Sequence, residues 1–455
     1  MGRGISLSPF LGEKTAFWPS NSTILRGGWH SPVDLGARIP PQSAIKRARR
    51  EMERRPYCPR PLDIAWIGGA VLATVPWVWA RLSGWHGSPP LEALLSGLCI
   101  VGAAFLISWA AEVAQIDVSQ SLAIALIALI AVLPEYAVDI YFAWAAGKDP
   151  KYIHYPVANM TGANRLLVGF GWPLVVFVSW WALGRREREV RLGKKRAIEA
   201  VFLGLATLYS FLLPIKGRIA LFDSLILILL FCFYARTLAR LPVEEPDLVG
   251  PPAVVALLGA GLRRMAVGAM FLYSGFSILL SAEPFAEALL KVAEGLGIER
   301  FIMVQWIAPL ASESPELVVA CYFAVRGKTS EGLGTLVSSK VNQWTLLIGS
   351  LPVVYSLSMG DFSALPLDAR QREEVLLTAA QSAFAFAVLL SLSISLIEAF
   401  ALFLLFSTQL LLPSIHARYI YSVIYLVLLA GYLVFRAKEV KGLVNAFRET
   451  VGEGG

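Results

Sequence analysis

The chain is poor in charged residues. Asp, Glu, Lys and Arg make up 16% of its 455 residues, whereas a soluble protein of this length carries about 25%. Hydrophobic residues make up 56%, and apolar runs recur from about Asp63 to Phe435. Many of these runs are long enough to cross roughly 30 Å of hydrocarbon. The composition excludes an ordinary soluble protein and predicts an all-α polytopic membrane protein, because the apolar pattern is not that of a barrel.

Cysteine and histidine are scarce, with four of each. The cysteines have no CxxC spacing, which excludes a disulfide or zinc framework. The histidines are dispersed and form no HExxH motif. A P-loop is missing, and no Ser/His or Asp/Asp arrangement typical of a hydrolase stands out. These absences argue against an enzyme and against ATP as an energy source.

The first 61 residues contain no long apolar run. They also lack the short basic region followed directly by an apolar core that marks a secretory signal. A basic cluster, Lys46–Arg50 with Arg54, Arg55 and Arg60, precedes the first apolar run. The formal net charge of +7 would suit nucleic acid, but this placement favours a topogenic role and contact with anionic lipid headgroups. We predict a cytoplasmic basic tail over 1–61 and no nucleic-acid partner.

About twelve apolar segments are predicted to cross the membrane. Basic residues concentrate in the two tails and in alternate loops, which places both termini in the cytoplasm by the positive-inside rule. The loops of Lys148 and Arg370 fall on the opposite side and weaken this asymmetry. An amphipathic stretch, 284–298, is predicted to lie near a surface between two spans. The predicted spans are 62–81, 89–113, 119–146, 155–183, 197–214, 219–239, 262–283, 300–326, 333–357, 375–392, 395–413 and 418–436.

Two proline–glutamate pairs lie inside apolar segments as parts of an internal repeat. They are Pro134-Glu135 and Pro315-Glu316. Each is followed at the same spacing by Phe-Ala, and a Gly-Lys pair comes after it in both copies. A carboxylate in hydrocarbon is costly, so an intramembrane glutamate is a functional hypothesis by default. Its recurrence in both halves of the chain predicts a site at a repeat interface. An asparagine follows each pair, with a glycine at the same distance beyond it: Asn164 with Gly171, and Asn342 with Gly349.

The two copies are predicted to cross the membrane in opposite directions. Glu135 lies in the third span, which runs outward, and Glu316 lies in the eighth, which runs inward. Ile219–Asp223 also resembles Ile394–Glu398 in the second half. We predict two inverted five-helix repeats with an extra transmembrane helix at each end. The predicted domains are the tail 1–61, an extra span in 62–88, repeats at 89–239 and 240–413, and a last span with a cytoplasmic tail at 414–455.

The residues around each pair are hard oxygen ligands. Proline removes a helical hydrogen bond, so Pro134 should free the carbonyl of Ile130, and Pro315 that of Ala311. Broken helices at membrane depth are tolerated where they line a cavity. Carbonyl, carboxylate and amide oxygens are the ligands that Ca²⁺ prefers. The alternative for a single glutamate is a structural salt bridge to Lys340 or Arg165, but two matched copies favour a cation site.

At these residues the chain resembles the membrane region of sodium/calcium exchangers, in the cation/Ca²⁺ antiporter superfamily. That family carries two alpha-repeats of the form (T/S)-S-x-P-E followed by G-N-x-x-G-S-N. The second block is similar to 158–164 and, more loosely, to 337–342. The similarity covers roughly 89–413 as an organisation and is specific around 128–171 and 309–349.

The resemblance implies an antiporter that moves Ca²⁺ against Na⁺ or another cation by alternating access. Its ligands would be the transported Ca²⁺ and Na⁺ (or H⁺), with no covalently bound cofactor. Spans 89–113 and 262–283 would correspond to the family's sliding gate pair. The metal ligands that it implies are Glu135, Glu316, Asn164, Asn342, Ser312 and Ser338.

This chain departs from the family pattern in both repeats. Ala131 and Val132 stand where repeat one should carry hydroxyl side chains. Repeat two adds an acid and a base, and four residues are candidate modulators of the site: Glu313, Lys340, Asp139 and Arg165.

The basic residues allow two explanations. Either Lys340 neutralises Glu313 and leaves the Glu135–Glu316 pair for one divalent ion, or Lys340 replaces a transported Na⁺ and favours protons as the counter-ion. A third interpretation is that the basic side chains snorkel away from the site. Asp139 would line the ion path or pair with Arg165.

We interpret the sequence as a secondary antiporter of a bacterial-type plasma (inner) membrane that exchanges Ca²⁺ for Na⁺ or H⁺. Two alternatives stay open at this stage. One is a cation/proton antiporter without calcium selectivity, and the other is a non-transporting membrane scaffold.

Overall fold

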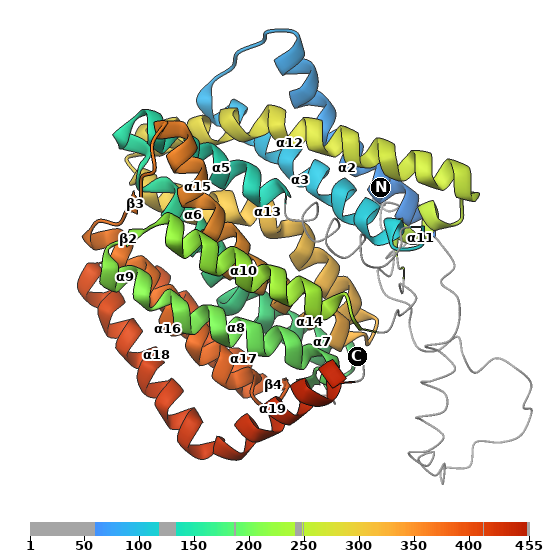
Figure 1. The fold of residues 1–455 in the computed structure, drawn as a ribbon. Helices are drawn as coiled ribbons and strands as arrows, with labels where there is room; N and C mark the ends of the chain where they lie inside the picture. The colour runs from blue at the N-terminus through green and yellow to red at the C-terminus, as the bar shows by residue number, and fades with distance from the viewer. Residues whose placement is uncertain are drawn as a thin grey trace, which may run out of the picture. The chain divides into compact units, whose positions relative to one another are not determined.

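The computed structural model describes residues 60–117, 133–185, 188–241, 248, 250–412 and 414–452 (Figure 1). Nearly all of the predicted tail 1–61 lies outside the described residues, and so does the first part of the predicted third span. The described residues from 60 onward belong to one compact unit.

Helices dominate the described part of the chain, and each predicted span coincides with one or more of them. The helices of the first half are α2 (Pro61–Leu82), α3 (Pro89–Ala114), α5 (Leu133–Lys148), η1 (Pro150–Tyr152), α6 (Tyr155–Leu166), η2 (Leu167–Gly171), α7 (Trp172–Ala182), η3 (Lys194–Arg196), α8 (Ala197–Ser210), α9 (Leu212–Lys216) and α10 (Leu221–Leu238). Those of the second half are α11 (Pro251–Ala256), α12 (Ala260–Leu296), α13 (Arg300–Val325), α14 (Thr329–Asn342), η4 (Gln343–Leu347), α15 (Ile348–Met359), α16 (Ala369–Leu389), α17 (Leu396–Leu410), α18 (Ile415–Phe435) and α19 (Ala437–Gly452).

Several helices begin where the sequence supplies the missing hydrogen bonds. Proline occupies the first turn of α2, α3 and α6, where its absent N–H costs nothing. Asp368 caps α16 by accepting from Gln371 N, and Ser395 caps α17 in the same way at Glu398 N. Such caps satisfy backbone donors that the helix leaves unpaired. The helix boundaries therefore follow from local sequence.

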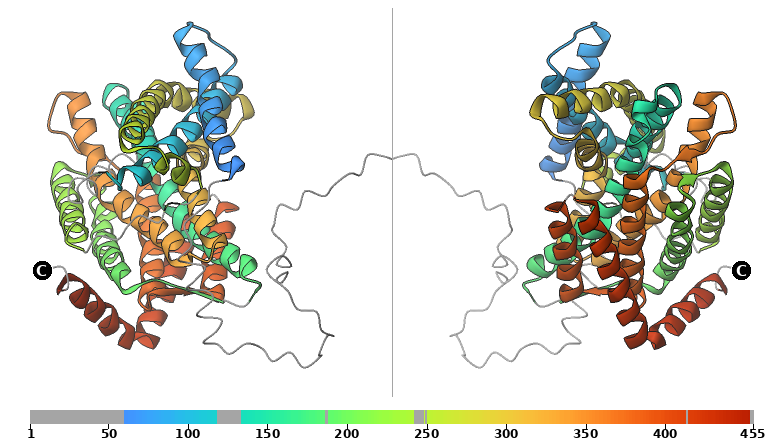
Figure 2. Two further views of the ribbon diagram at one scale, coloured as in Figure 1. Left: turned by 90° about the vertical axis from the view of Figure 1, so that its right-hand side faces the viewer. Right: turned by 90° about the vertical axis from the view of Figure 1, so that its left-hand side faces the viewer.

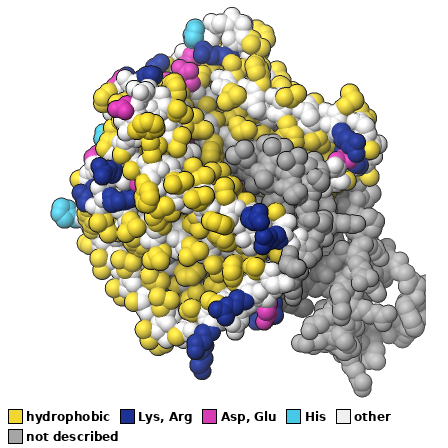
Figure 3. Space-filling model, in the orientation of Figure 1, with side chains coloured by type: hydrophobic (Ala, Val, Ile, Leu, Met, Phe, Trp, Pro, Cys, Tyr) yellow, Lys and Arg dark blue, Asp and Glu magenta, His cyan; other side chains and the backbone are white. Residues whose placement is uncertain are grey.

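The outer helices expose apolar side chains and bury polar ones. The buried residues of α18 are Arg418, Ser422 and Tyr425, whereas Val427 and Val434 are exposed. In Figure 3, hydrophobic side chains cover most of the visible face and charged ones lie toward its edges. A helix with its polar side inward is stable where hydrocarbon covers its outer side. Within the described residues, seven helices are long and apolar enough to cross a membrane.

Four short strands correct the prediction of a purely helical chain. They are β1 (Glu189–Arg191), β2 (Arg218–Ile219), β3 (Leu365–Pro366) and β4 (Ser393–Ser395). Two antiparallel ladders join them, with Val190 opposite Ile394 and Ile219 opposite Leu365. Val190 precedes Ile219 by as many residues as Leu365 precedes Ile394. If Val190 is superposed on Leu365 and Ile394 on Ile219, the first ladder therefore falls on the second.

The stretch 284–298 is not a separate surface element, contrary to the prediction. It continues α12, which runs unbroken from Ala260 to Leu296 through Pro284. The helix ends at Gly297, which adopts φ +66, a left-handed conformation that glycine accepts without a steric penalty. The α12 helix lies alongside α3 over its length in Figures 1 and 2. Helices α11 and α19 were not predicted either.

Candidate ion-binding site

Three glutamates from two helices lie together inside the helix assembly. Glu135 stands on α5 and Glu313 on α13, and they are 3% and 2% exposed. Their carboxyl groups lie within hydrogen-bonding reach of each other. Glu316, one turn further along α13, is half-buried and interacts electrostatically with both. The two predicted glutamates are thus close in space, and Glu313 lies with them.

A glutamine that sequence reasoning missed completes this cluster. The Nε2 of Gln343 donates to Oε1 of Glu313 at 2.7 Å, and Gln343 also lies beside Glu135. One oxygen each of Glu135, Glu313 and Glu316 is buried without a hydrogen-bond donor. Neighbouring buried carboxylates repel each other, so a cation or a proton must compensate them. Gln343 directly follows Asn342, and that position was the available signal.

The two asparagines are held in different ways. Asn164 on α6 accepts a hydrogen bond from Lys340 Nζ at its Oδ1, at 2.7 Å. Asn342 at the end of α14 accepts one from the hydroxyl of Tyr136 at 3.1 Å, and its amide nitrogen has no partner. Both asparagines are buried. In this conformation the Asn164 amide oxygen is therefore occupied by an ammonium group.

The two candidate serines also differ. Ser312 lies one turn before Glu316 and is 4% exposed, and its hydroxyl donates to the carbonyls of Ala308 and Pro309 at 3.3 Å. The Ser338 hydroxyl is 2.7 Å from the hydroxyl of Tyr234 on α10. Ser312 thus lies beside the glutamates, whereas the Ser338 hydroxyl is engaged by an outer helix.

Pro315 does not break its helix, which corrects the predicted break in the backbone. The α13 helix runs continuously from Arg300 to Val325 with Pro315 inside it. The hydroxyl of Ser314 donates to the Ala311 carbonyl at 3.0 Å, so this oxygen already has a donor. The other predicted free carbonyl, that of Ile130, lies outside the described residues.

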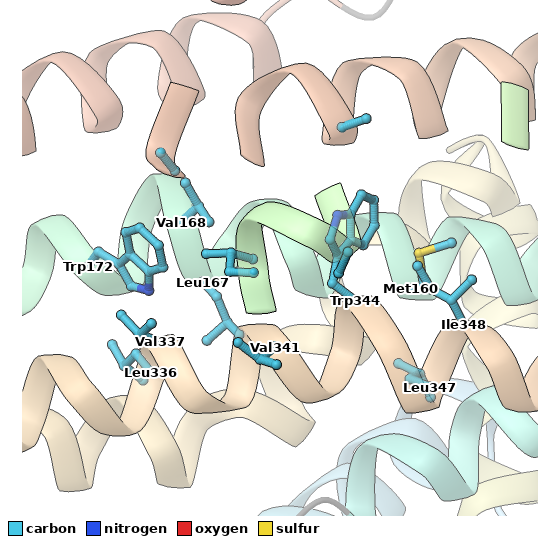
Figure 4. Packing of buried hydrophobic residues seen from close by; sticks show 14 of the residues in the cluster. Met160, Leu167, Val168, Trp172, Leu336, Val337, Val341, Trp344, Leu347 and Ile348 are labelled. Carbon is cyan, nitrogen blue, oxygen red and sulfur yellow. The ribbon is translucent and has the colours of Figure 1, made fainter. Parts of the chain in front are cut away.

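Regular helix geometry is lost elsewhere, just beyond the two asparagines. A π-helical turn, η2, follows Asn164, and a second, η4, follows Asn342 directly. Such turns are frequent at functional sites in helices. Trp172, the first residue of α7 directly after η2, packs against Leu336 and Val337 of α14, so the two segments lie side by side (Figure 4). The packing brings the neighbourhoods of the two asparagines together.

Asp139 lies one turn beyond Glu135 and is completely buried. Neither of its carboxyl oxygens has a hydrogen-bond partner. Asn159 of α6 lies next to it without the geometry of a hydrogen bond, and its own amide is unpartnered. Asp139 therefore does not pair with Arg165, although its position beside the glutamates fits a role along the ion path.

Arg165 is bound by acids on α16, contrary to every alternative that the sequence offered. Its Nη2 lies 2.5 Å from Oε2 of Glu374, and both side chains are at most 1% exposed. The other oxygen of Glu374 pairs with Arg418 of α18, and Arg418 also lies 3.6 Å from Glu373. Arg165 neither snorkels nor neutralises Glu135.

The sequence carried a signal for this buried network. Glu374 precedes Glu398 by as many residues as Glu199 precedes Asp223, which extends the internal repeat to another acid. The predicted span began at residue 375, so Glu374 fell just outside it. Arg418 was likewise placed at the edge of the last span. Charges at the ends of predicted spans can therefore belong to a buried network.

Lys340 contradicts two of the three sequence explanations. It is completely buried, so it does not snorkel. Its ammonium donates to Asn164, while Glu313 is bonded to Gln343, so Lys340 does not form an ion pair with Glu313. These contacts leave the third explanation, a cation in the place of a transported ion.

The donor set is one of oxygen atoms from carboxyl, amide and hydroxyl groups. Within the described residues, no group of three or more His, Cys, Asp or Glu side chains is arranged to hold a metal ion. Hard oxygen donors fit a hard cation such as Ca²⁺, which takes six to eight of them.

Apolar outer surfaces and a buried cluster of acids define a multi-pass membrane protein with an internal polar site. The family model described as "Sodium/calcium exchanger protein" matches residues 91–239 and 267–438, which is well over half of the chain. The chain belongs to this family.

Solved structures give two comparisons. A crystal structure of the H⁺/Ca²⁺ exchanger CAX is 49% identical, with 86% of this chain and 99% of that chain covered and a TM-score of 0.82. A structure of the sodium-calcium exchanger NCX_Mj is 17% identical, with 72% and 99% covered and a TM-score of 0.48. No curated protein matches the chain.

Proposed function

We propose that this protein exchanges Ca²⁺ for protons across a membrane by alternating access. The observation that carries the proposal is the buried contact between Glu135 and Glu313, with Glu316 beside them. No lysine or arginine among the described residues forms an ion pair with these three glutamates. Without a cation, such a cluster must hold protons, because adjacent carboxyl groups in a dry site cannot all be charged. Ca²⁺ and protons then compete for the same oxygens.

The family and the 49% identical relative support this assignment. That relative is described as an H⁺/Ca²⁺ exchanger, whereas the family is described as sodium/calcium exchangers. We assign Glu135 and Glu316 as principal ligands, with Glu313, Asn342 and Ser312 as further donors. Asn164 and Ser338 join them only if their present partners move away.

The two-repeat arrangement is part of the proposal. The exchange symmetry of the two strand ladders supports repeats within 89–239 and 240–413, with the site at the interface between them. We further propose twelve spans, with α3 and α12 as the moving gate pair. The basic tail 1–61 would bind anionic lipids at the cytoplasmic face of a plasma (inner) membrane, with both termini in the cytoplasm.

Calcium flux into liposomes tests the proposal. The purified full-length protein is reconstituted, and ⁴⁵Ca²⁺ uptake is measured with an imposed pH gradient, an imposed Na⁺ gradient, or neither. We expect uptake to follow the pH gradient. Uptake that follows only Na⁺ would overturn the choice of counter-ion, and no uptake under either gradient would overturn calcium exchange itself.

A further inference from the structure

Lys340 occupies the surroundings of a bound cation. Its Nζ donates to Oδ1 of Asn164 at 2.7 Å and to the main-chain oxygen of the same residue at 3.2 Å. It also lies over the indole of Trp344, 4.5 Å from the ring centroid. Carbonyl oxygens and the face of an indole are groups that attract a positive charge. A free monovalent ion would use the same oxygens.

Charges of both signs lie near Lys340. Glu135 and Glu313 both interact with it electrostatically. Arg165 is the nearby charge of the same sign, and its pairing with Glu374 at 2.5 Å compensates it. Lys340 thus supplies a positive charge to the acid cluster while its hydrogen bonds go to Asn164.

Repeat one has no counterpart of this ammonium. Lys340 lies two residues before Asn342, and the residue two before Asn164 is Gly162. A Cβ at Gly162 would lie 1.8 Å from the carbonyl oxygen of Gln305, so α13 leaves no room for a side chain there. The pair of repeats therefore holds a single lysine at this position, and it reaches from one repeat to the asparagine of the other.

We propose that Lys340 is a resident cation that takes the place of a transported monovalent ion at Asn164 and thereby excludes Na⁺ from the site. The inference rests on the proposed exchange function and identifies what selects the counter-ion. A Na⁺ ion would have to displace a tethered ammonium from both oxygens of Asn164. Ca²⁺ and protons avoid this competition because they bind at the glutamates.

The test compares the full-length protein with Lys340→Gln. Uptake of ⁴⁵Ca²⁺ into liposomes is driven by a pH gradient or by a Na⁺ gradient, with N-methylglucamine replacing Na⁺ at constant ionic strength. We expect the unsubstituted protein to ignore Na⁺. Loss of the ammonium should raise the Na⁺ affinity of the vacated oxygens by roughly tenfold or more, since it removes a like charge at contact distance. Uptake by the variant should then respond to Na⁺.

Two further variants isolate the cause. Lys340→Arg keeps the positive charge and should remain indifferent to Na⁺. Lys148→Gln is the matched control, because Lys148 also donates to a main-chain carbonyl, that of Ser358 at 2.7 Å, and lies over Trp144 at 5.5 Å. It belongs to the end of α5 and not to the glutamate cluster. It should leave both kinds of uptake unchanged.

A binding measurement keeps the inference separate from calcium flux. Thermal unfolding of the detergent-solubilised protein is followed with Na⁺ or N-methylglucamine. Na⁺ should raise the midpoint for Lys340→Gln and leave that of the unsubstituted protein unchanged, whether or not either protein transports Ca²⁺. If Lys340→Gln does not fold, the test rests on the unsubstituted protein. The inference is refuted if Na⁺ stabilises that protein or drives its ⁴⁵Ca²⁺ uptake. It is supported if Na⁺ changes neither its unfolding midpoint nor its uptake. A folded Lys340→Gln that ignores Na⁺ also refutes it.

Discussion

The segments around Asn164 and Asn342 hold matched positions in the chain but carry opposite chemistry. After Asn164 comes Arg165, which points away from the glutamates and is bound by Glu374 at 2.5 Å. After Asn342 comes Gln343, which points toward them and donates to Glu313. The internal repeat therefore places polar residues at equivalent positions, while the residues that contact them in the folded protein determine their roles.

Substitution of the glutamates in the proposed site should reduce transport more than substitution elsewhere. Glu135→Gln and Glu316→Gln remove one negative charge each from the proposed site, and each should abolish pH-driven ⁴⁵Ca²⁺ uptake, a loss of roughly a hundredfold or more. Glu313→Gln should retain part of the activity, because this residue has no acid counterpart in repeat one, where Val132 stands. Equal retention in all three variants would remove the basis for the proposed site.

The buried acid–base network gives the next largest effect. Glu374→Gln removes the carboxylate that pairs with both Arg165 and Arg418 and leaves Glu373, 3.6 Å from Arg418, as the acid beside them. Breaking a buried pair costs about 3–5 kcal/mol. The matched control is Glu199→Gln in repeat one. Its partner Arg196, 2.7 Å away, is 32% exposed, so water can compensate that charge. We expect thermal unfolding to show a clearly larger loss for Glu374→Gln, and an equal loss would contradict the contrast.

A substitution at Gly162 tests why repeat one has no counterpart of Lys340. Gly162→Ala places a methyl group 1.8 Å from the Gln305 carbonyl, so α6 and α13 must separate, at a cost of about 1–3 kcal/mol as for other overpacked sites. Gly275→Ala on α12 is the control, since a Cβ there meets nothing within 4 Å. Only Gly162→Ala should lower the midpoint temperature of thermal unfolding. Equal stability of the two variants would show that repeat one has room for a side chain after all.

A surface ion pair should give the smallest effect. Asp117, just past the end of α3, is held by Arg263 at 2.7 Å and Arg264 at 3.1 Å on α12. Hydrogen bonding to Arg263, then to Arg264, lowers the pKa of the Asp117 carboxyl from 3.8 to about 2. A carboxyl whose pKa is lowered by folding stabilises the fold above its unfolded pKa and loses that contribution as the pH falls.

The contribution of Asp117 should therefore disappear between about pH 4 and pH 2. Asp117→Asn should lower the unfolding midpoint slightly at neutral pH and make no difference at the acid end of this window. High salt should shrink the share of the effect that comes from Arg264, because its side chain is 66% exposed. A midpoint difference that persists unchanged at pH 2 would exclude the ion pair as its cause.

The repeat could be predicted because each glutamate is followed at the same spacing by Phe-Ala, and each asparagine at the same spacing by a glycine. The predicted ends of most spans were also close to the observed helices, since proline and capping residues act locally. The partners of Arg165 and Lys340 could not be predicted. Glu374 is far from Arg165 in the sequence, and Asn164 is far from Lys340. A long basic side chain can also reach several neighbours.

The amino-acid sequence by itself determined the membrane class, the helices and the two Pro-Glu copies, because hydrophobicity, helix ends and spacing are properties of neighbouring residues. Only the tertiary structure decided that Pro315 leaves α13 continuous, that Glu313 joins the glutamate pair and that Lys340 binds Asn164. Each of these depends on which buried polar groups meet across helices. In a dry interior every charge must find a partner, and the fold alone supplies the choice.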